Sequence, residues 1–122
     1  MKSNDTGIKR ILKAFCYSYD GFTATFKSEA AFRQDLLFCF VMGLMLFFLP
    51  VRGLALAFML FSLMLILLME LVNTAIEAVV DRIGAEYHPL SKKAKDIGSL
   101  LVLLAFIHWG LVWGIIVFPV FF

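Results

Sequence analysis

Charged residues are scarce in this sequence: Asp, Glu, Lys and Arg make up 16% of its 122 residues, and the net charge is only +2. A chain with so few charges lacks the basic surface of nucleic-acid-binding domains, so we exclude that class. Hydrophobic residues, in contrast, make up 62%, with 14 Phe among them. Soluble domains contain about 45–50% apolar residues. We therefore expect a membrane protein that is surrounded mainly by lipid.

Nucleotide-binding motifs and cysteine clusters are also absent. The sequence contains neither the GxxxxGK phosphate loop nor the Gly-rich loop of protein kinases, so any ATP site must be built in an unrelated way. Cys16 and Cys39 form no CxxC pair and no Cys/His cluster, which argues against a structural zinc site and a disulfide framework. At this length we expect a single membrane domain over residues 1–122.

Three apolar segments are long enough to cross a bilayer, which takes about 20 helical residues. We expect span one over residues 30–49, span two over 54–80 and span three over 98–122. The short break between the first two favours a tight turn, and a polar loop is expected over 81–97. The predicted fold is therefore all-α, with three antiparallel transmembrane helices.

A further helix is expected before span one, over residues 5–28. Asp5 or Thr6 suits the N-cap position at its start. Apolar residues recur at steps of three and four, at Ile8, Ile11, Leu12, Phe15, Tyr19, Phe22 and Phe26. Charged residues fall between them, which indicates an amphipathic helix lying on the membrane surface.

Lysine and arginine are distributed unevenly along the chain. Five of them precede span one and four lie in the 81–97 segment, whereas Arg52 stands alone in the turn between spans one and two. Loops with an excess of Lys and Arg remain in the cytoplasm. We therefore expect the N-terminus and the 81–97 loop to face the cytoplasm.

Polar residues mark one face of span two. Glu70, Asn73, Glu77 and Asp81 are offset by three, seven and eleven positions, which places them in one narrow stripe of a helix. Glu77 and Asp81 are equally compatible with ordinary solvated charges at a helix end. Glu70, however, follows a long uncharged run at the membrane boundary, where an ionised carboxylate is costly. We therefore interpret Glu70 as a functional residue.

This stripe suits phosphoryl transfer to a lipid hydroxyl. Glu70 and Glu77 are separated by roughly 10 Å along the helix axis, so one can meet the lipid headgroups and the other the cytosol. Glu70 would act as general base, and Glu77 would supply a hard oxygen ligand to a magnesium ion that carries phosphates. Cations for the transferred group are available at Lys95 and, on the amphipathic helix, at Arg10 and Lys13.

Three further residues allow two interpretations each. Glu29 is a second candidate carboxylate, but it also stands four residues before Arg33, which is the spacing of a helical ion pair. His88 can contact a nucleotide or can simply be exposed in the loop. Trp113 can pack inside the protein or anchor it at the membrane surface, and packing is the favoured interpretation.

Three stretches closely resemble the prokaryotic diacylglycerol kinase family: GIKRILKAFCYSYDG at 7–21, EAAFRQD at 29–35 and ELVNTAIEAVVDRIGAEYHPLSKKAKDIGS at 70–99. The similarity runs from about Gly7 to Trp113 without an evident insertion. It implies a homotrimer of three-span subunits in the bacterial inner membrane, with active sites between subunits. Its implied activity is the synthesis of phosphatidate from diacylglycerol and MgATP.

The resemblance also implies roles for individual residues. Glu70 would be the base, supported by Asn73, and the carboxylates of Glu29 and Glu77 would hold Mg²⁺. The nucleotide would contact Arg10, Tyr17, Glu29, Glu77, Glu86, Tyr87, His88, Lys95 and Asp96. The lipid would contact Arg10, Ala14, Ser18, Tyr19, Ala31, Phe32, Arg33, Gln34, Asp35, Glu70, Ser99 and Trp113.

Two departures from the family pattern keep alternatives open. Leu100 and Leu101 stand where the family is expected to have small residues. Pro89, in the sequence YHPL, resembles the residue found in the sister enzymes that phosphorylate undecaprenol. Undecaprenol is therefore the second candidate substrate. A small proton-coupled transporter or channel is the non-enzymatic alternative, although the carboxylates continue into no polar path through the other spans.

Overall fold

The computed structural model describes residues 6–122, and within that range the fold is entirely helical. It consists of α1 (Gly7–Ser28), α2 (Ala30–Met45), the short 3-10 helix η1 (Leu46–Phe48), α3 (Leu54–Ile83) and α4 (Pro89–Phe121). Three segments are long and apolar enough to cross a membrane: α2 together with η1, α3, and α4. The prediction of an all-α fold with three spans is confirmed.

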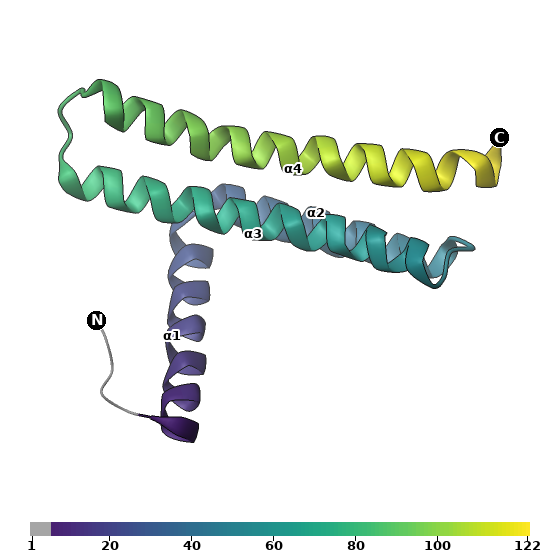
Figure 1. Cartoon of the computed structure of the whole chain (residues 1–122), viewed down its shortest axis with the longest axis horizontal. Coiled ribbons are helices and arrows are strands. Elements are labelled where there is room, and N and C mark those ends of the chain that lie inside the picture. Colours follow the sequence, from purple (N-terminus) through teal and green to yellow (C-terminus); the bar gives the residue numbers. More distant parts are fainter. Residues whose placement is uncertain (1–5) are drawn as a thin grey trace.

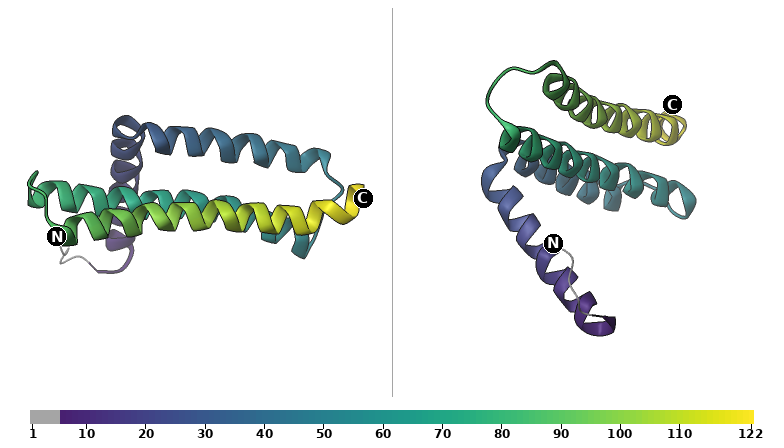
Figure 2. Two further views of the ribbon diagram at one scale, coloured as in Figure 1. Left: turned by 90° about the horizontal axis from the view of Figure 1, so that it is seen from above. Right: turned by 60° about the vertical axis from the view of Figure 1, so that its left-hand side comes forward.

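The three long helices lie side by side, with α3 in contact with both α2 and α4. Figure 2 shows the same arrangement from two further directions. Helix α1 leaves the start of α2 at a steep angle and projects away from the other helices (Figure 1). Its apolar side chains, such as Ile8 and Phe15, are exposed along this projecting arm, as expected of a helix that meets a membrane surface.

Glycine and proline set the ends of α3 and α4. Gly53 precedes α3 with φ 67°, a left-handed conformation that glycine adopts without steric cost. Gly84 ends α3, and Pro89 occupies the first turn of α4, where its missing N–H is not needed. The ring of His88 caps α4 by accepting a hydrogen bond from the backbone N–H of Leu90 at 3.1 Å.

The boundaries differ from the expected ones in two places. Only residues 84–88 of the predicted 81–97 loop are non-helical, because α3 continues to Ile83 and α4 begins at Pro89. An ion pair between Lys92 and Asp96, four residues apart, supports the charged first turns of α4. At the other end of the chain, Thr6 occupies the N-cap of α1 without a capping side-chain hydrogen bond, and Asp5 lies outside the described residues.

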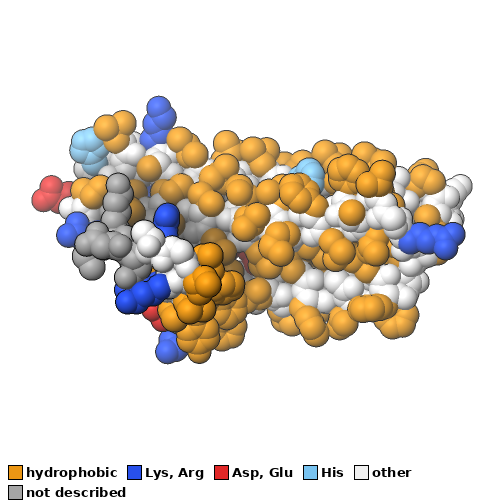
Figure 3. Space-filling model, turned by 60° about the horizontal axis from the view of Figure 1, so that its bottom comes forward, with side chains coloured by type: hydrophobic (Ala, Val, Ile, Leu, Met, Phe, Trp, Pro, Cys, Tyr) orange, Lys and Arg blue, Asp and Glu red, His pale blue; other side chains and the backbone are white. Residues whose placement is uncertain are grey.

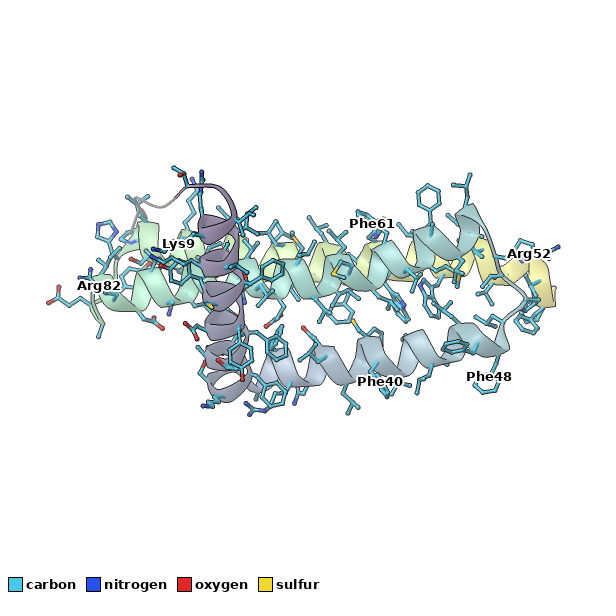
Figure 4. The ribbon with its side chains drawn as sticks, turned by 90° about the horizontal axis from the view of Figure 1, so that it is seen from below. Lys9, Phe40, Phe48, Arg52, Phe61 and Arg82 are labelled. Atoms are coloured by element: carbon cyan, nitrogen blue, oxygen red, sulfur yellow. The ribbon has the colours of Figure 1, made fainter. Side chains whose placement is uncertain are left out.

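Large apolar side chains face outward over most of the surface. Figure 3 shows hydrophobic groups covering the long helices, with charged groups gathered around α1 and at the ends of the bundle. Phe40, Phe48 and Phe61 point away from the bundle, and Arg52 marks one of its ends (Figure 4). A soluble protein would bury these rings, so their exposure fits a chain surrounded by lipid.

The buried core lies mainly between α3 and α4 and contains one polar chain. The indole N–H of Trp113 donates to the hydroxyl of Ser62 at 3.0 Å, and that hydroxyl donates to the carbonyl of Met59 at 2.6 Å. Trp113 is only 7% exposed. Within one subunit the structure therefore gives Trp113 a packing role, and the predicted contact with lipid stays a prediction.

Replacing Trp113 with Phe should destabilise the protein, because Ser62 then loses its donor in a buried site. We expect a loss of about 0.5–1.5 kcal/mol, the usual net contribution of one hydrogen bond, because the Ser62 hydroxyl keeps its bond to the carbonyl of Met59. Thermal or denaturant unfolding in detergent micelles measures it. Trp109→Phe is the matched control, because the indole N–H of Trp109 has no hydrogen-bond partner in residues 6–122. Equal losses in the two variants would contradict the assigned hydrogen bond.

Candidate active site

The polar stripe predicted for span two is present on α3. Glu70 is 5% exposed and is the one charged residue of the described chain that is buried. One turn further along, the side-chain amide of Asn73 donates to Oε1 of Glu77 at 3.1 Å. Both of these side chains are half-buried. The helix thus carries a buried carboxyl group, an amide and a more accessible carboxylate in line.

Asp35 on α2 completes the surroundings of Glu70. The two carboxyl groups lie within hydrogen-bonding distance of each other, although Asp35 belongs to a different span. The contact joins α2 to the polar stripe of α3. The family resemblance implies a lipid contact for Asp35, and the sequence does not reveal its contact with Glu70, because that contact depends on how α2 is rotated against α3.

Glu29 stands at the elbow between α1 and α2. Its extended backbone, with φ −115° and ψ 106°, separates the two helices, and its side chain is half-buried. Besides Glu70, this part of the structure thus contains three carboxyl groups: Glu29 at the elbow, Asp35 on α2 and Glu77 on α3.

Arg33 fixes this elbow. Its guanidinium donates to the carbonyls of Phe26 at 2.5 Å and Lys27 at 3.2 Å. A cation on the free carbonyls at a helix C-terminus is favourable, so Arg33 holds the end of α1 against the start of α2. The alternative ion pair between Glu29 and Arg33 is absent from the described part of the chain. Glu29 is therefore not neutralised by its helical neighbour.

A second polar site lies at the turn between α3 and α4. A hollow of about 420 Å³ opens there, and five of the residues predicted to contact a nucleotide line it: Glu86, Tyr87, His88, Lys95 and Asp96. Lys95 forms an ion pair with Asp81 at 2.6 Å, and Asp96 pairs with Lys92 at 2.6 Å. All four side chains are exposed, so these pairs contribute little to stability and can exchange partners.

Other predicted residues do not converge on this hollow. Arg10, Ala14, Tyr17, Ser18 and Tyr19 lie on α1, which packs on α2 and projects away from α3 and α4. Ser18 donates to the carbonyl of Ala14 at 2.9 Å. In a single subunit these residues are therefore remote from the turn between α3 and α4.

The residues predicted to contact lipid around the elbow differ in exposure. Ala31 and Gln34 are exposed on the first turns of α2, and Ser99 is exposed on α4. Phe32, in contrast, is 2% exposed and meets the ring of Phe22 edge to face, with 5.7 Å between their centroids. Phe32 therefore joins α1 to α2 and presents little surface to a ligand.

The donor atoms of the stripe fit a magnesium ion. Magnesium is usually bound by one or two carboxylates and completes its shell with water and substrate phosphates. Glu29 and Glu77 offer such oxygens. Within residues 6–122, no group of three or more His, Cys, Asp and Glu side chains lies close enough together to hold a metal ion.

Comparison with known proteins decides the family. The family model described as "Prokaryotic diacylglycerol kinase" matches residues 16–117. The chain belongs to the prokaryotic diacylglycerol kinase family. The resemblance seen in its sequence motifs is thereby confirmed.

Individual members of the family are similar over nearly their whole length. The diacylglycerol kinase of Escherichia coli is 44% identical over 116 residues, which cover 95% of both chains. That of Pseudomonas aeruginosa is 47% identical over 111 residues, covering 91% of this chain and 90% of its own. The Haemophilus influenzae enzyme is 40% identical over 113 residues, covering 93% and 96%. The chain is therefore a member of a lipid kinase family and has three helices able to cross a membrane.

Proposed function

We propose that the protein transfers the γ-phosphate of MgATP to the hydroxyl group of diacylglycerol and so forms phosphatidic acid. The observation that carries this proposal is the position of Glu70. Its carboxyl is buried where the apolar part of α3 ends, and Glu77, two turns further, is accessible from the charged end of the helices. A lipid hydroxyl and a phosphate can therefore approach the same stripe from opposite directions.

Glu70 is the proposed general base. The lipid hydroxyl oxygen forms a bond to the γ-phosphorus while the bond from that phosphorus to the bridging oxygen of ATP breaks, which releases ADP. The hydroxyl proton passes to the carboxylate of Glu70. Asp35 holds the Glu70 carboxyl in place by the contact between the two groups. Asn73 holds Glu77 in the same way, through the hydrogen bond from its side-chain amide.

Glu29 and Glu77 are the proposed ligands of Mg²⁺, which neutralises phosphate charge in reactions of this class. Arg33 does not neutralise either carboxylate, because its guanidinium is hydrogen-bonded to the end of α1. The hollow at the turn between α3 and α4 would hold the nucleotide through Glu86, Tyr87, His88, Lys95 and Asp96. Lys95 would exchange its partner Asp81 for a phosphate.

A shared site explains the position of α1. Arg10 and Tyr17 cannot lie beside their own α3–α4 turn because α1 projects away from it, so we propose that they act on a site of a neighbouring subunit in a homotrimer. The exposed residues of α1 and of the elbow, such as Tyr19, Ala31 and Gln34, would contact the lipid at the membrane surface. We place the N-terminus and the turn on the cytoplasmic side of the bacterial inner membrane, following the Lys and Arg distribution.

Replacing Glu70 with Gln should reduce turnover by on the order of 10²–10⁴-fold, the usual contribution of a general base. The fold should survive, because the amide of the variant can still donate a hydrogen bond to Asp35. Transfer of labelled γ-phosphate from MgATP to diacylglycerol and, in parallel, to undecaprenol measures this with purified protein in mixed micelles.

Asp20→Asn is the matched control for the loss of a carboxylate, because Asp20 is exposed on α1 and has no proposed role. Near-normal turnover of Glu70→Gln would exclude Glu70 as the base. Labelled undecaprenyl phosphate in place of phosphatidic acid would keep the mechanism and change the substrate.

Replacing Lys95 with Met should raise the KM for ATP by about tenfold or more, because a charged hydrogen bond to phosphate contributes about 1.5–3 kcal/mol. The KM for diacylglycerol should change little. Lys93→Met is the control, since Lys93 lies two residues away but does not line the hollow. An unchanged KM for ATP in Lys95→Met would remove Lys95 from the nucleotide site.

A further inference from the structure

Helices α3 and α4 make a very close contact where Gly98 faces Asn73. Gly98 is buried in α4. A Cβ atom at this position would lie 2.3 Å from Oδ1 of Asn73, 3.3 Å from its Cγ and 3.5 Å from its Cα. The first of these distances is far below a van der Waals contact. Only glycine, with a hydrogen in place of a side chain, thus fits at position 98 while Asn73 keeps its orientation.

Gly98 and Glu77 hold the amide of Asn73 from opposite sides. Its Nδ2 donates to Oε1 of Glu77 at 3.1 Å, whereas its Oδ1 is buried and has no hydrogen-bond partner in the described part of the chain. That oxygen lies against the Gly98 backbone, where only a weak Cα–H contact is available to it. The space left by the missing side chain therefore decides where the amide sits.

We infer that Gly98 is a positioning residue for the kinase reaction: it admits the amide of Asn73 in the orientation that holds the Glu77 carboxylate. This inference rests on the proposed roles of Asn73 and Glu77, and it adds a residue of α4 to a stripe formed by α3. Neither sequence spacing nor charge indicates Gly98, because its contribution is the absence of a side chain.

A purely structural role would give a different result from a positioning role. Glycine inside a helix is less favourable than alanine, so Gly98→Ala by itself favours α4. The nearest atom to the added methyl is the tip of a side chain, and a rotation of Asn73 relieves the overlap without moving a helix. Stability should therefore stay equal or rise while activity falls.

The first test compares Gly98→Ala with Gly110→Ala in the same helix, where an added Cβ meets no atom within 4 Å. We expect kcat of Gly98→Ala to fall by on the order of 10- to 100-fold, the effect of misplacing a catalytic group by about 1 Å. Its KM for diacylglycerol and its melting temperature should match those of the control. A kcat equal to that of Gly110→Ala would overturn the inference.

A double-mutant cycle separates this inference from the proposed function. In the Asn73→Ala background the closest remaining contact of the added Cβ is the Cα of residue 73 at 3.5 Å, an ordinary distance. Gly98→Ala should then cause no further loss of kcat. A full additional loss would overturn the inference while leaving the role of Asn73 intact. If Asn73→Ala itself keeps normal turnover, the proposed function of the stripe fails.

The orientation of the amide can also be observed without turnover. Asparagine occurs only at positions 4 and 73, so protein labelled with [¹⁵N-amide]asparagine gives two side-chain NH₂ signals. The signal lost in Asn73→Ala identifies residue 73. Gly98→Ala should shift that signal, and Gly110→Ala should leave it in place. An unmoved signal would overturn the inference.

If Gly98→Ala fails to fold, the double variant with Asn73→Ala should fold, because the overlap is gone. That pattern would assign Gly98 to helix packing alone and would also overturn the inference.

Discussion

A carboxyl group buried among apolar helices must find polar partners in the protein, because lipid supplies none. An ionised carboxylate in such surroundings costs several kcal/mol unless it is paired or hydrogen-bonded. Glu70 meets this requirement through Asp35, which brings α2 to the polar face of α3. The same contact places a polar residue of α2 beside the stripe of α3, while Arg33 and Phe32 hold α1 against the start of α2.

The helix α3 organises the molecule because it combines two patterns. In its first half, Met59 and Ile66 are completely buried, and Ser62 accepts a hydrogen bond from the indole N–H of Trp113. Its second half carries the polar stripe. Gly98 of α4 lies against Asn73 in this stripe. Close packing there brings α4 against Asn73 without adding a side chain to the site.

Composition and spacing predict most of this fold. Long apolar runs fix the spans, and Gly53, Gly84 and Pro89 set the ends of α3 and α4. The polarity of the 81–97 segment favours a loop, but polarity does not exclude a helix: Pro89 in the first turn and the cap from His88 start α4 inside this segment. The stripe on α3 was also predictable, because residues on one helix keep fixed relative directions.

Contacts between helices were not predictable in this way. Asp35 meets Glu70, and Gly98 meets Asn73, only because the helices adopt particular rotations, which no spacing within one segment encodes. Arg33 shows the same limit: spacing favours a pair with Glu29, yet the broken helix at Glu29 exposes the carbonyls of α1, and Arg33 binds those.

The direction of α1 is the strongest argument for a site that is formed by more than one subunit. Arg33 and Phe32 fasten the end of α1 to α2, so the elbow is fixed and the arm cannot fold back without losing those contacts. The charges on α1 are consequently held away from the hollow that their own subunit forms at the α3–α4 turn. In the proposed homotrimer, the arm of a neighbouring copy would reach this hollow while α1 keeps its contacts with α2.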